Sequence, residues 1–115
     1  MYGGLADVNP INTWTFDGVD WRMENPTQQP DVLYYAAAAW DPGLGEVVSF
    51  GGGGSTGITW AWTGSDWTQV ATTQAPAPRE SLSMAYDEAV GHVLLFGGED
   101  STNQYDDTWE FLGTP

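Results

Sequence analysis

The sequence predicts an all-β chain that repeats one unit of four short antiparallel strands. The segment VVSFGG at residues 47–52 recurs as VLLFGG at residues 93–98, which is 46 positions later. At the same offset, NTWTFDGVDW at 12–21 recurs as ITWAWTGSDW at 58–67. The motif begins once more as DTWEFLG at 107–113. Independent segments that share one period indicate a repeat architecture. No stretch carries a helical period over about ten residues, so we expect no α-helix.

The strands follow from short apolar runs that end at glycine-rich turns. One repeat contains an alternating run, a β-branched and aromatic run that two glycines stop, an alternating polar and aromatic run, and a last strand after a tight turn. These strands are expected at residues 79–86, 92–96, 59–62 and 67–71. The alanine run at 36–39 corresponds to residues 82–85 of the next copy. We therefore predict a strand there rather than a helix.

The repeat motif resembles a known family. An apolar strand, a diglycine, the pattern [DN]TW-x-[FW]-x-G and a further tryptophan are similar to kelch repeats, and residues 75–111 are especially similar to the bacterial kelch-type repeats related to the galactose oxidase propeller domain. The resemblance implies a β-propeller, in which each blade is a four-stranded antiparallel sheet packed face to face with its neighbours. The earlier copy departs from the family at Leu33, where the family arginine (Arg79 in the later copy) would fall, and at Ser49. We expect that copy to lack the interblade contact of Arg79.

The resemblance covers residues 1–115 as a single array of about 2.3 blades. Residues 1–24 are expected to form a partial blade that includes a stub with Gly3 and Gly4, residues 31–71 a full blade, and residues 78–113 a partial blade with strands one to three. We expect a homo-oligomer that closes a propeller, with a trimer of about six blades favoured. Both ends carry a third strand, so one is redundant in a perfect closure. The alternative is that the chain is a fragment of a larger secreted protein.

The repeated glycines and tryptophans have structural roles in this interpretation. Glycine after the second strand permits positive φ and close backbone approach, and the glycines at these positions are Gly51, Gly52, Gly97 and Gly98. Tryptophans on the third and fourth strands are expected to fill the space between blades, each stabilising the fold by about 5 kcal/mol. These are Trp14, Trp60 and Trp109 on third strands and Trp21 and Trp67 on fourth strands.

Charge argues against polyanionic partners. The chain has 16 acidic residues, two arginines and no lysine, for a net charge of −14. Such a chain repels phosphate backbones and anionic lipids, so we expect no nucleic acid and no membrane partner. The N-terminal residues show no signal-peptide pattern, and no apolar run approaches the length of a membrane span. The location in the cell stays unknown, although the family resemblance points towards the bacterial exterior.

No constellation for catalysis or metal binding is found. The chain has no cysteine and one histidine, His92, so the copper chemistry of galactose oxidase is not carried over. The pairs Glu99/Asp100 and Asp106/Asp107 lack the spacing of a calcium loop. The glycine run at 51–54 lacks the GK[ST] of a phosphate loop. We expect no catalytic residue, no cofactor and no metal, and therefore not an enzyme.

A binding or scaffold module is the leading hypothesis. Propellers present loops at one face, and the longest loops here join second to third strands at 5–11, 53–57 and 99–106. The candidate binding residues in them are Asp7, Asn9, Glu99, Asp100, Asn103 and Tyr105. The partner is a protein or, in a lectin-like alternative, a carbohydrate.

Overall fold

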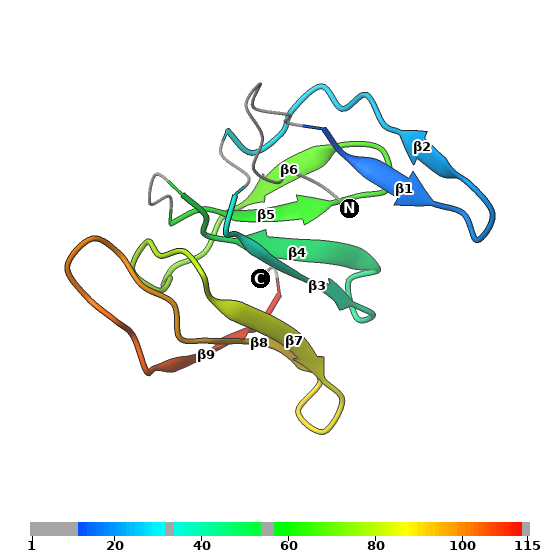
Figure 1. Ribbon diagram of the computed structural model, residues 1–115. Helices are drawn as coiled ribbons and strands as arrows, with labels where there is room; N and C mark the ends of the chain where they lie inside the picture. Colours follow the sequence, from blue (N-terminus) through cyan, green and yellow to red (C-terminus); the bar gives the residue numbers. More distant parts are fainter. Residues whose placement is uncertain (1–11, 32–33, 54–56, 114–115) are drawn as a thin grey trace.

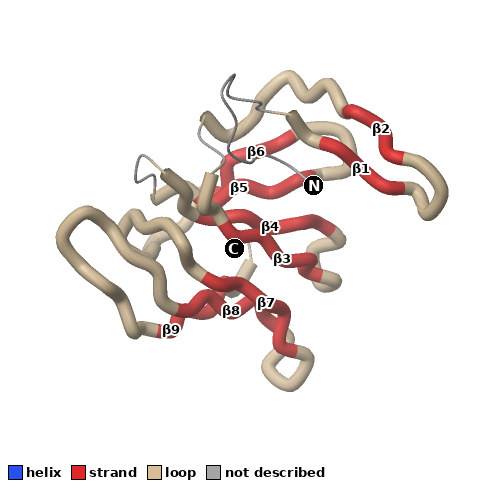
Figure 2. Tube along the Cα trace, in the orientation of Figure 1, coloured by secondary structure: helices blue, strands red, loops and turns tan. Residues whose placement is uncertain are grey.

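The chain folds into three antiparallel sheets. The computed structural model describes residues 12–31, 34–53 and 57–113, and within these ranges it contains nine strands and no helix (Figures 1 and 2). The strands are β1 Trp14–Phe16, β2 Trp21–Met23, β3 Ala37–Asp41, β4 Glu46–Phe50, β5 Thr59–Trp62, β6 Trp67–Val70, β7 Ser83–Asp87, β8 His92–Phe96 and β9 Thr108–Phe111. The described part thus has no helix able to cross a membrane. The predicted all-β class is confirmed.

The second sheet is a four-stranded blade with the order β3-β4-β5-β6. The first sheet contains β1-β2 and the third contains β7-β8-β9. The predicted strands at 92–96 and 59–62 are confirmed, and the alanine run lies in β3 as expected. The predicted strand at 79–86 was wrong at its start. Ser81 has a φ of +57°, and its N–H donates to the Tyr35 carbonyl at 2.8 Å, so regular pairing begins only at Ser83.

Strand register repeats between the second and third sheets. Phe50 lies opposite Thr59 on β4–β5, and Phe96 lies opposite Thr108 on β8–β9. The chain needs nine positions to go from Phe50 to Thr59 and twelve to go from Phe96 to Thr108. The three additional residues are therefore absorbed in the loop at 97–107, and the pairing of the strands is unchanged.

The sheets are layered, with the second between the first and the third (Figure 1). On one face of the second sheet, Phe50 packs with Leu82 and Leu95 of the third-sheet segment. The opposite face carries a cluster of Trp60, Trp62 and Trp67, with Val47 against it. The Trp67 Nε1–H donates to the Thr13 hydroxyl at 2.8 Å, which joins this face to the segment that enters β1. The middle blade therefore has an apolar core on each side, as face-to-face packing predicts.

The glycine prediction is confirmed for every copy that the structure describes. Gly51, Gly52, Gly97 and Gly98 all have positive φ. A Cβ added to Gly51 would overlap the Arg79 carbonyl oxygen and lie 2.9 Å from the Leu82 side chain. Glycine is needed at that position for its conformation and for the close approach of the neighbouring segment. Gly3 and Gly4 lie outside the described residues.

The tryptophan prediction holds for some positions and was wrong for one. Trp60 and Trp67 are buried, and Trp14 and Trp109 are partly buried. Trp21 is 53% exposed, although it occupies the same repeat position as Trp67, which is 1% exposed. The difference arises from context, because all three residues of β2 are exposed, whereas Trp67 packs with Trp60 and Trp62.

Candidate functional site

Arg79 is the buried charge at the centre of the candidate site. It is 1% exposed, and its guanidinium donates from Nη1 and Nη2 to the two carboxylate oxygens of Asp107 at 2.5 and 3.0 Å. Nη1 also donates to the Gly97 carbonyl at 2.9 Å, and Nε donates to the Ala77 carbonyl at 3.0 Å. Burial of a guanidinium is tolerated when a bidentate carboxylate and carbonyls satisfy its donors in this way.

Arg79 contacts the second sheet in a different way from the one expected of its side chain. The Arg79 side chain bonds to Ala77, Gly97 and Asp107, all in the segment of the third sheet. The link to the second sheet is made by the backbone, because the Gly52 N–H donates to the Arg79 carbonyl oxygen at 3.0 Å. The expected contact of Arg79 with the neighbouring sheet is thus made by its carbonyl and not by its side chain, and Leu33 of the earlier copy lies outside the described residues. Arg79 stabilises its own blade through its side chain and contacts the neighbouring blade through its carbonyl.

The loop that follows β8 brings three of the predicted binding residues together. The Tyr105 hydroxyl donates to Asp100 Oδ2 at 2.5 Å, and the backbone N–H groups of Thr102 and Asn103 donate to Asp100 Oδ1 at 2.8 Å each. The Tyr105 ring lies 3.9 Å from the Arg79 guanidinium carbon, a cation–π contact. Asp100, Asn103 and Tyr105 thus form a connected group that rests on Arg79.

The other predicted binding residues lie elsewhere. Glu99 contributes its backbone, which exchanges hydrogen bonds with Glu80 at 2.8 and 2.9 Å. Asp7 and Asn9 lie outside the described residues. The loop is held in shape by its own polar groups, so any ligand bound there meets a preformed surface and competes with these internal bonds.

The charges in this network are stabilised by their partners. Hydrogen bonds from Arg79, and then from the Trp109 Nε1–H at 2.8 Å, hold the pKa of Asp107 well below its usual range. The Tyr105 hydroxyl and the backbone N–H groups of Thr102 and Asn103 do the same for the pKa of Asp100. The Asp100 carboxylate in turn raises the pKa of Tyr105. All these shifts favour the charged carboxylates and the neutral phenol at neutral pH.

Asp107 is the residue of this network that sequence reasoning missed. In the sequence, Asp107 stood out only as a member of an acidic pair with Asp106. The repeat contained a usable signal, because Arg79 and Asp107 occur together in one copy, whereas Leu33 and Ile58 occupy the corresponding positions of the earlier copy. A charged pair that is present or absent as a unit indicates two side chains in contact.

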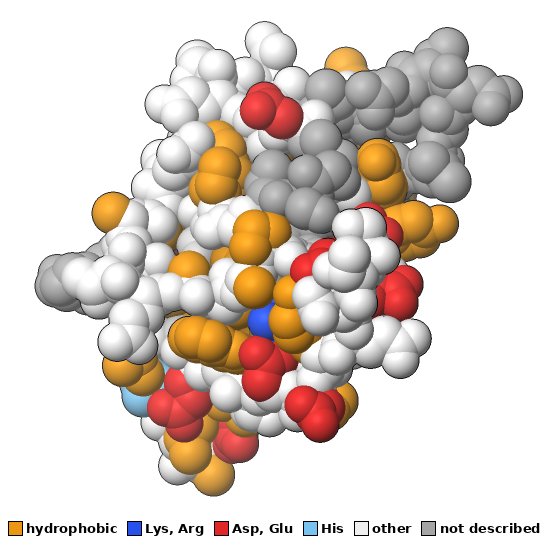
Figure 3. Space-filling view, turned by 90° about the vertical axis from the view of Figure 1, so that its left-hand side faces the viewer, with side chains coloured by type: hydrophobic (Ala, Val, Ile, Leu, Met, Phe, Trp, Pro, Cys, Tyr) orange, Lys and Arg blue, Asp and Glu red, His pale blue; other side chains and the backbone are white. Residues whose placement is uncertain are grey.

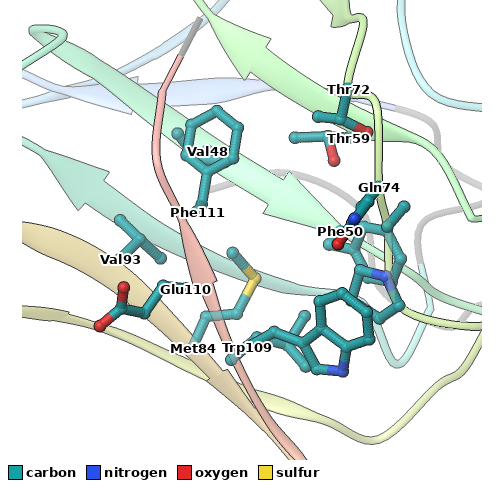
Figure 4. Close-up of a pocket in the computed structure, with 13 residues that line it drawn as sticks. Val48, Phe50, Thr59, Thr72, Gln74, Met84, Val93, Trp109, Glu110 and Phe111 are labelled. Atoms are coloured by element: carbon teal, nitrogen blue, oxygen red, sulfur yellow. The ribbon is translucent and has the colours of Figure 1, made fainter.

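A small apolar cavity of about 50 Å³ lies between the second and third sheets. Its lining includes Val48 and Phe50 of β4, Met84 of β7 and Trp109 and Phe111 of β9 (Figure 4). Its lining joins the apolar core between these sheets, and it has space for only a few water molecules. We therefore interpret it as a packing defect between blades.

A larger open groove of about 550 Å³ runs along β9. One wall is formed by residues 71–74, which follow β6, and the other by residues 109–113. Within the described ranges, β9 pairs only with β8, so its second edge faces this groove. Edge strands with free backbone groups are sites where another strand can pair.

The described surface is acidic. Figure 3 shows one face on which red acidic side chains surround orange apolar ones and only a small blue area is visible. In the part of the chain that the structure describes, no group of three His, Asp or Glu side chains is placed to hold a metal ion. His92 Nδ1 lies 3.6 Å from a Glu110 carboxylate oxygen, across β8 and β9. No protein-family model matches the chain, and a comparison with curated proteins finds no match.

Proposed function

We propose that this chain is a kelch-like β-propeller module without catalytic activity, and that it assembles with copies of itself into a binding or scaffold ring. The observation that supports this most is the repetition of blade-like sheets that pack face to face with one shared register. In such a stack each blade depends on its neighbours for burial of its faces. A stack with two outer blades therefore gains stability by adding further blades.

The exposed apolar side chains support assembly. Four large apolar residues of the first sheet and its turn are exposed, namely Phe16, Val19, Trp21 and Met23. At the other side of the molecule, Val90, Phe96 and Leu112 of the third-sheet segment are exposed as well. Exposed apolar groups gathered on outer layers are typical of interaction surfaces.

Three copies are the favoured assembly, since they supply about six blades and propellers close with about four to eight. Each copy carries a net charge of −14, so copies repel one another over a distance that shrinks as salt is added. Assembly is therefore expected to strengthen from low to moderate ionic strength. The loop at 99–106 of each copy would then lie on one face of the ring and form the surface for a protein or carbohydrate ligand.

The test is the solution mass of the purified chain, measured by light scattering after size exclusion at about 20 and 200 mM salt. A discrete oligomer of two to four chains of 12.5 kDa agrees with the proposal. A folded, stable monomer at both salt concentrations contradicts self-assembly. A polydisperse sample favours the alternative that these blades belong to a longer propeller.

A further inference from the structure

We propose that β2 of a second copy pairs antiparallel along the free edge of β9, with Arg22 of the second copy opposite Glu110. We call this contact the β9–β2 seam. It rests on the self-assembly proposed above and names the surfaces that would produce it. It makes the groove beside β9 the place where one copy ends and the next begins.

The β9 edge has the position that a fourth strand occupies in the complete blade. In the second sheet, β6 lies along β5, and β5 corresponds to β9 through the shared register with β4 and β8. In the third sheet that position is the open groove between residues 71–74 and 109–113. The groove has a volume of about 550 Å³ and runs along β9 from Trp109 to Phe111.

β2 matches this position in register and side-chain type. Trp67 lies opposite Trp62 on β5–β6, and Trp21 lies opposite Phe16 on β1–β2 in the same arrangement. Applied to β9, this register places Trp21 of the second copy opposite Phe111 and Met23 of the second copy opposite Trp109. Both pairs join large apolar side chains, and cross-strand pairs of this kind stabilise sheets.

The same register places opposite charges together. Arg22 is 78% exposed and contacts Glu24 at 3.5 Å, which leaves most of its guanidinium in solvent. The Glu110 side chain is 46% exposed and lies on the opposite side of β9 from Trp109 (Figure 4). Arg22 and Arg79 are the two basic residues of the chain apart from His92, and Arg79 is buried. In a chain of net charge −14, Arg22 is thus the exposed arginine available to Glu110 of another copy.

Only a second copy can supply β2 to this edge. Within one chain the first and third sheets lie on opposite sides of the second sheet (Figure 1), so β2 cannot reach β9 of the same chain. Within the described residues β2 pairs on one side with β1, and its other edge is open. The register above uses the edge of β2 that pairs with β1, so β9 of the other copy takes the place of β1 in the seam. The seam therefore displaces β1, the third strand that is redundant in a closed ring. Such a head-to-tail contact repeats from copy to copy and generates a ring when the rotation closes.

Charge reversal tests the seam. Arg22→Glu and Glu110→Arg are each expected to weaken assembly by at least about tenfold, because each places like charges opposite one another. The double variant R22E/E110R keeps the net charge of the wild type and is expected to restore the oligomer. Glu88→Arg, which makes the same charge change in the exposed turn at 87–91, is the control and should keep the wild-type mass. Masses are measured by light scattering and sedimentation velocity, with circular dichroism to verify folding.

Cross-linking gives an independent readout. The chain has no cysteine, so a mixture of R22C and E110C copies can form a disulfide between the two variants only where residues 22 and 110 meet. Oxidation is expected to give a heterodimer identified by mass spectrometry, since opposed cross-strand positions place Cβ atoms about 4.5–5.5 Å apart. A mixture of R22C and E88C is the matched control and should give background levels.

The outcomes of these experiments distinguish failure of the β9–β2 seam from failure of the proposed self-assembly. A wild-type oligomer that survives both single charge reversals, with no R22C–E110C cross-link, overturns the seam and leaves assembly through another surface. A wild-type monomer overturns both. Loss of the oligomer in each single variant, with its recovery in the double variant, supports the seam.

Discussion

The backbone N–H of Gly52 donates to the carbonyl oxygen of Arg79 at 3.0 Å and so joins the second sheet to the segment that leads into the third. The diglycine turn and the arginine, which are two separate features of the repeat, meet at this bond. The bond fixes the backbone of Arg79, and the Arg79 side chain then reaches Gly97 of the next diglycine and Asp107. Through Arg79, the diglycine turn of the second sheet is therefore linked to the diglycine turn of the third sheet.

Gly51→Ala tests the close approach at this junction. Gly51 has a φ of +80°, and an added Cβ would overlap the Arg79 carbonyl. Gly45→Ala is the matched control, because Gly45 has a φ of +71° and nothing within 4 Å of the added Cβ. Both variants pay the cost of a left-handed residue, and Gly51→Ala is expected to lose about 2 kcal/mol more in free energy of unfolding. Urea unfolding measures the free energy of unfolding of both variants. Equal losses in the two variants would show that the close approach of the Arg79 carbonyl to Gly51 does not affect stability.

Arg79→Lys tests the geometry of the buried guanidinium. Lysine keeps the charge but cannot donate to both Asp107 oxygens and to the Gly97 and Ala77 carbonyls from one planar group. The free energy of unfolding is expected to fall by about 2 kcal/mol. Arg22→Lys, at a position that is largely exposed, is the control and should change stability by less than about 0.5 kcal/mol. If the two variants are equally stable in urea, the bidentate pair does not stabilise the blade.

Asp107→Asn tests the charge interaction between Arg79 and Asp107 through the pH dependence of the free energy of unfolding. The pKa of Asp107 lies below its ordinary value of 3.8 in the folded protein, because the carboxylate accepts hydrogen bonds from Arg79 and Trp109. A lowered pKa means that the stabilisation is fully present above the unfolded pKa and is lost as pH falls through the folded pKa. The wild type should therefore exceed the variant by about 1 kcal/mol at pH 7, a modest value because the Asp107 side chain is 39% exposed.

The gap in stability between wild type and Asp107→Asn should narrow as the pH is lowered from 5 towards 2. Urea unfolding at several pH values measures it. Asp106→Asn, which removes the exposed neighbouring carboxylate, controls for the change in net charge. A gap that stays constant or widens on acidification would contradict the assigned role of the Arg79–Asp107 pair.

Strand positions could be predicted because they depend on local signals. The diglycines stop β4 and β8, and their positive φ follows from residue type and from the 46-residue repeat. The start of β7 could not be predicted, because it depends on the Ser81 N–H donating to Tyr35, a residue far away in sequence. A local pattern contains no information about such a partner.

The site was less predictable than the fold because burial depends on neighbours. Trp21 and Trp67 share a repeat position, yet one is exposed and the other buried, since only Trp67 has the cluster of Trp60 and Trp62 beside it. Likewise, Asp100 and Tyr105 were predicted as ligand contacts from their loop position. In the structure they bond to one another, and the Tyr105 ring lies over Arg79.

The hydrogen bond between Trp67 and Thr13 is expected to couple the first and second sheets. Thr13 is buried, and its hydroxyl accepts from the Trp67 Nε1–H at 2.8 Å. Thr13→Val removes the acceptor at nearly constant volume, and Trp67→Phe removes the donor. A double-mutant cycle in urea should give a coupling energy of about 1 kcal/mol, the usual net value of such a bond. Thr68→Val, an exposed position on the same strand as Trp67, is the control for the cycle and should show no coupling to Thr13→Val. A coupling energy near zero for the Thr13–Trp67 pair would mean that this hydrogen bond does not couple the first and second sheets.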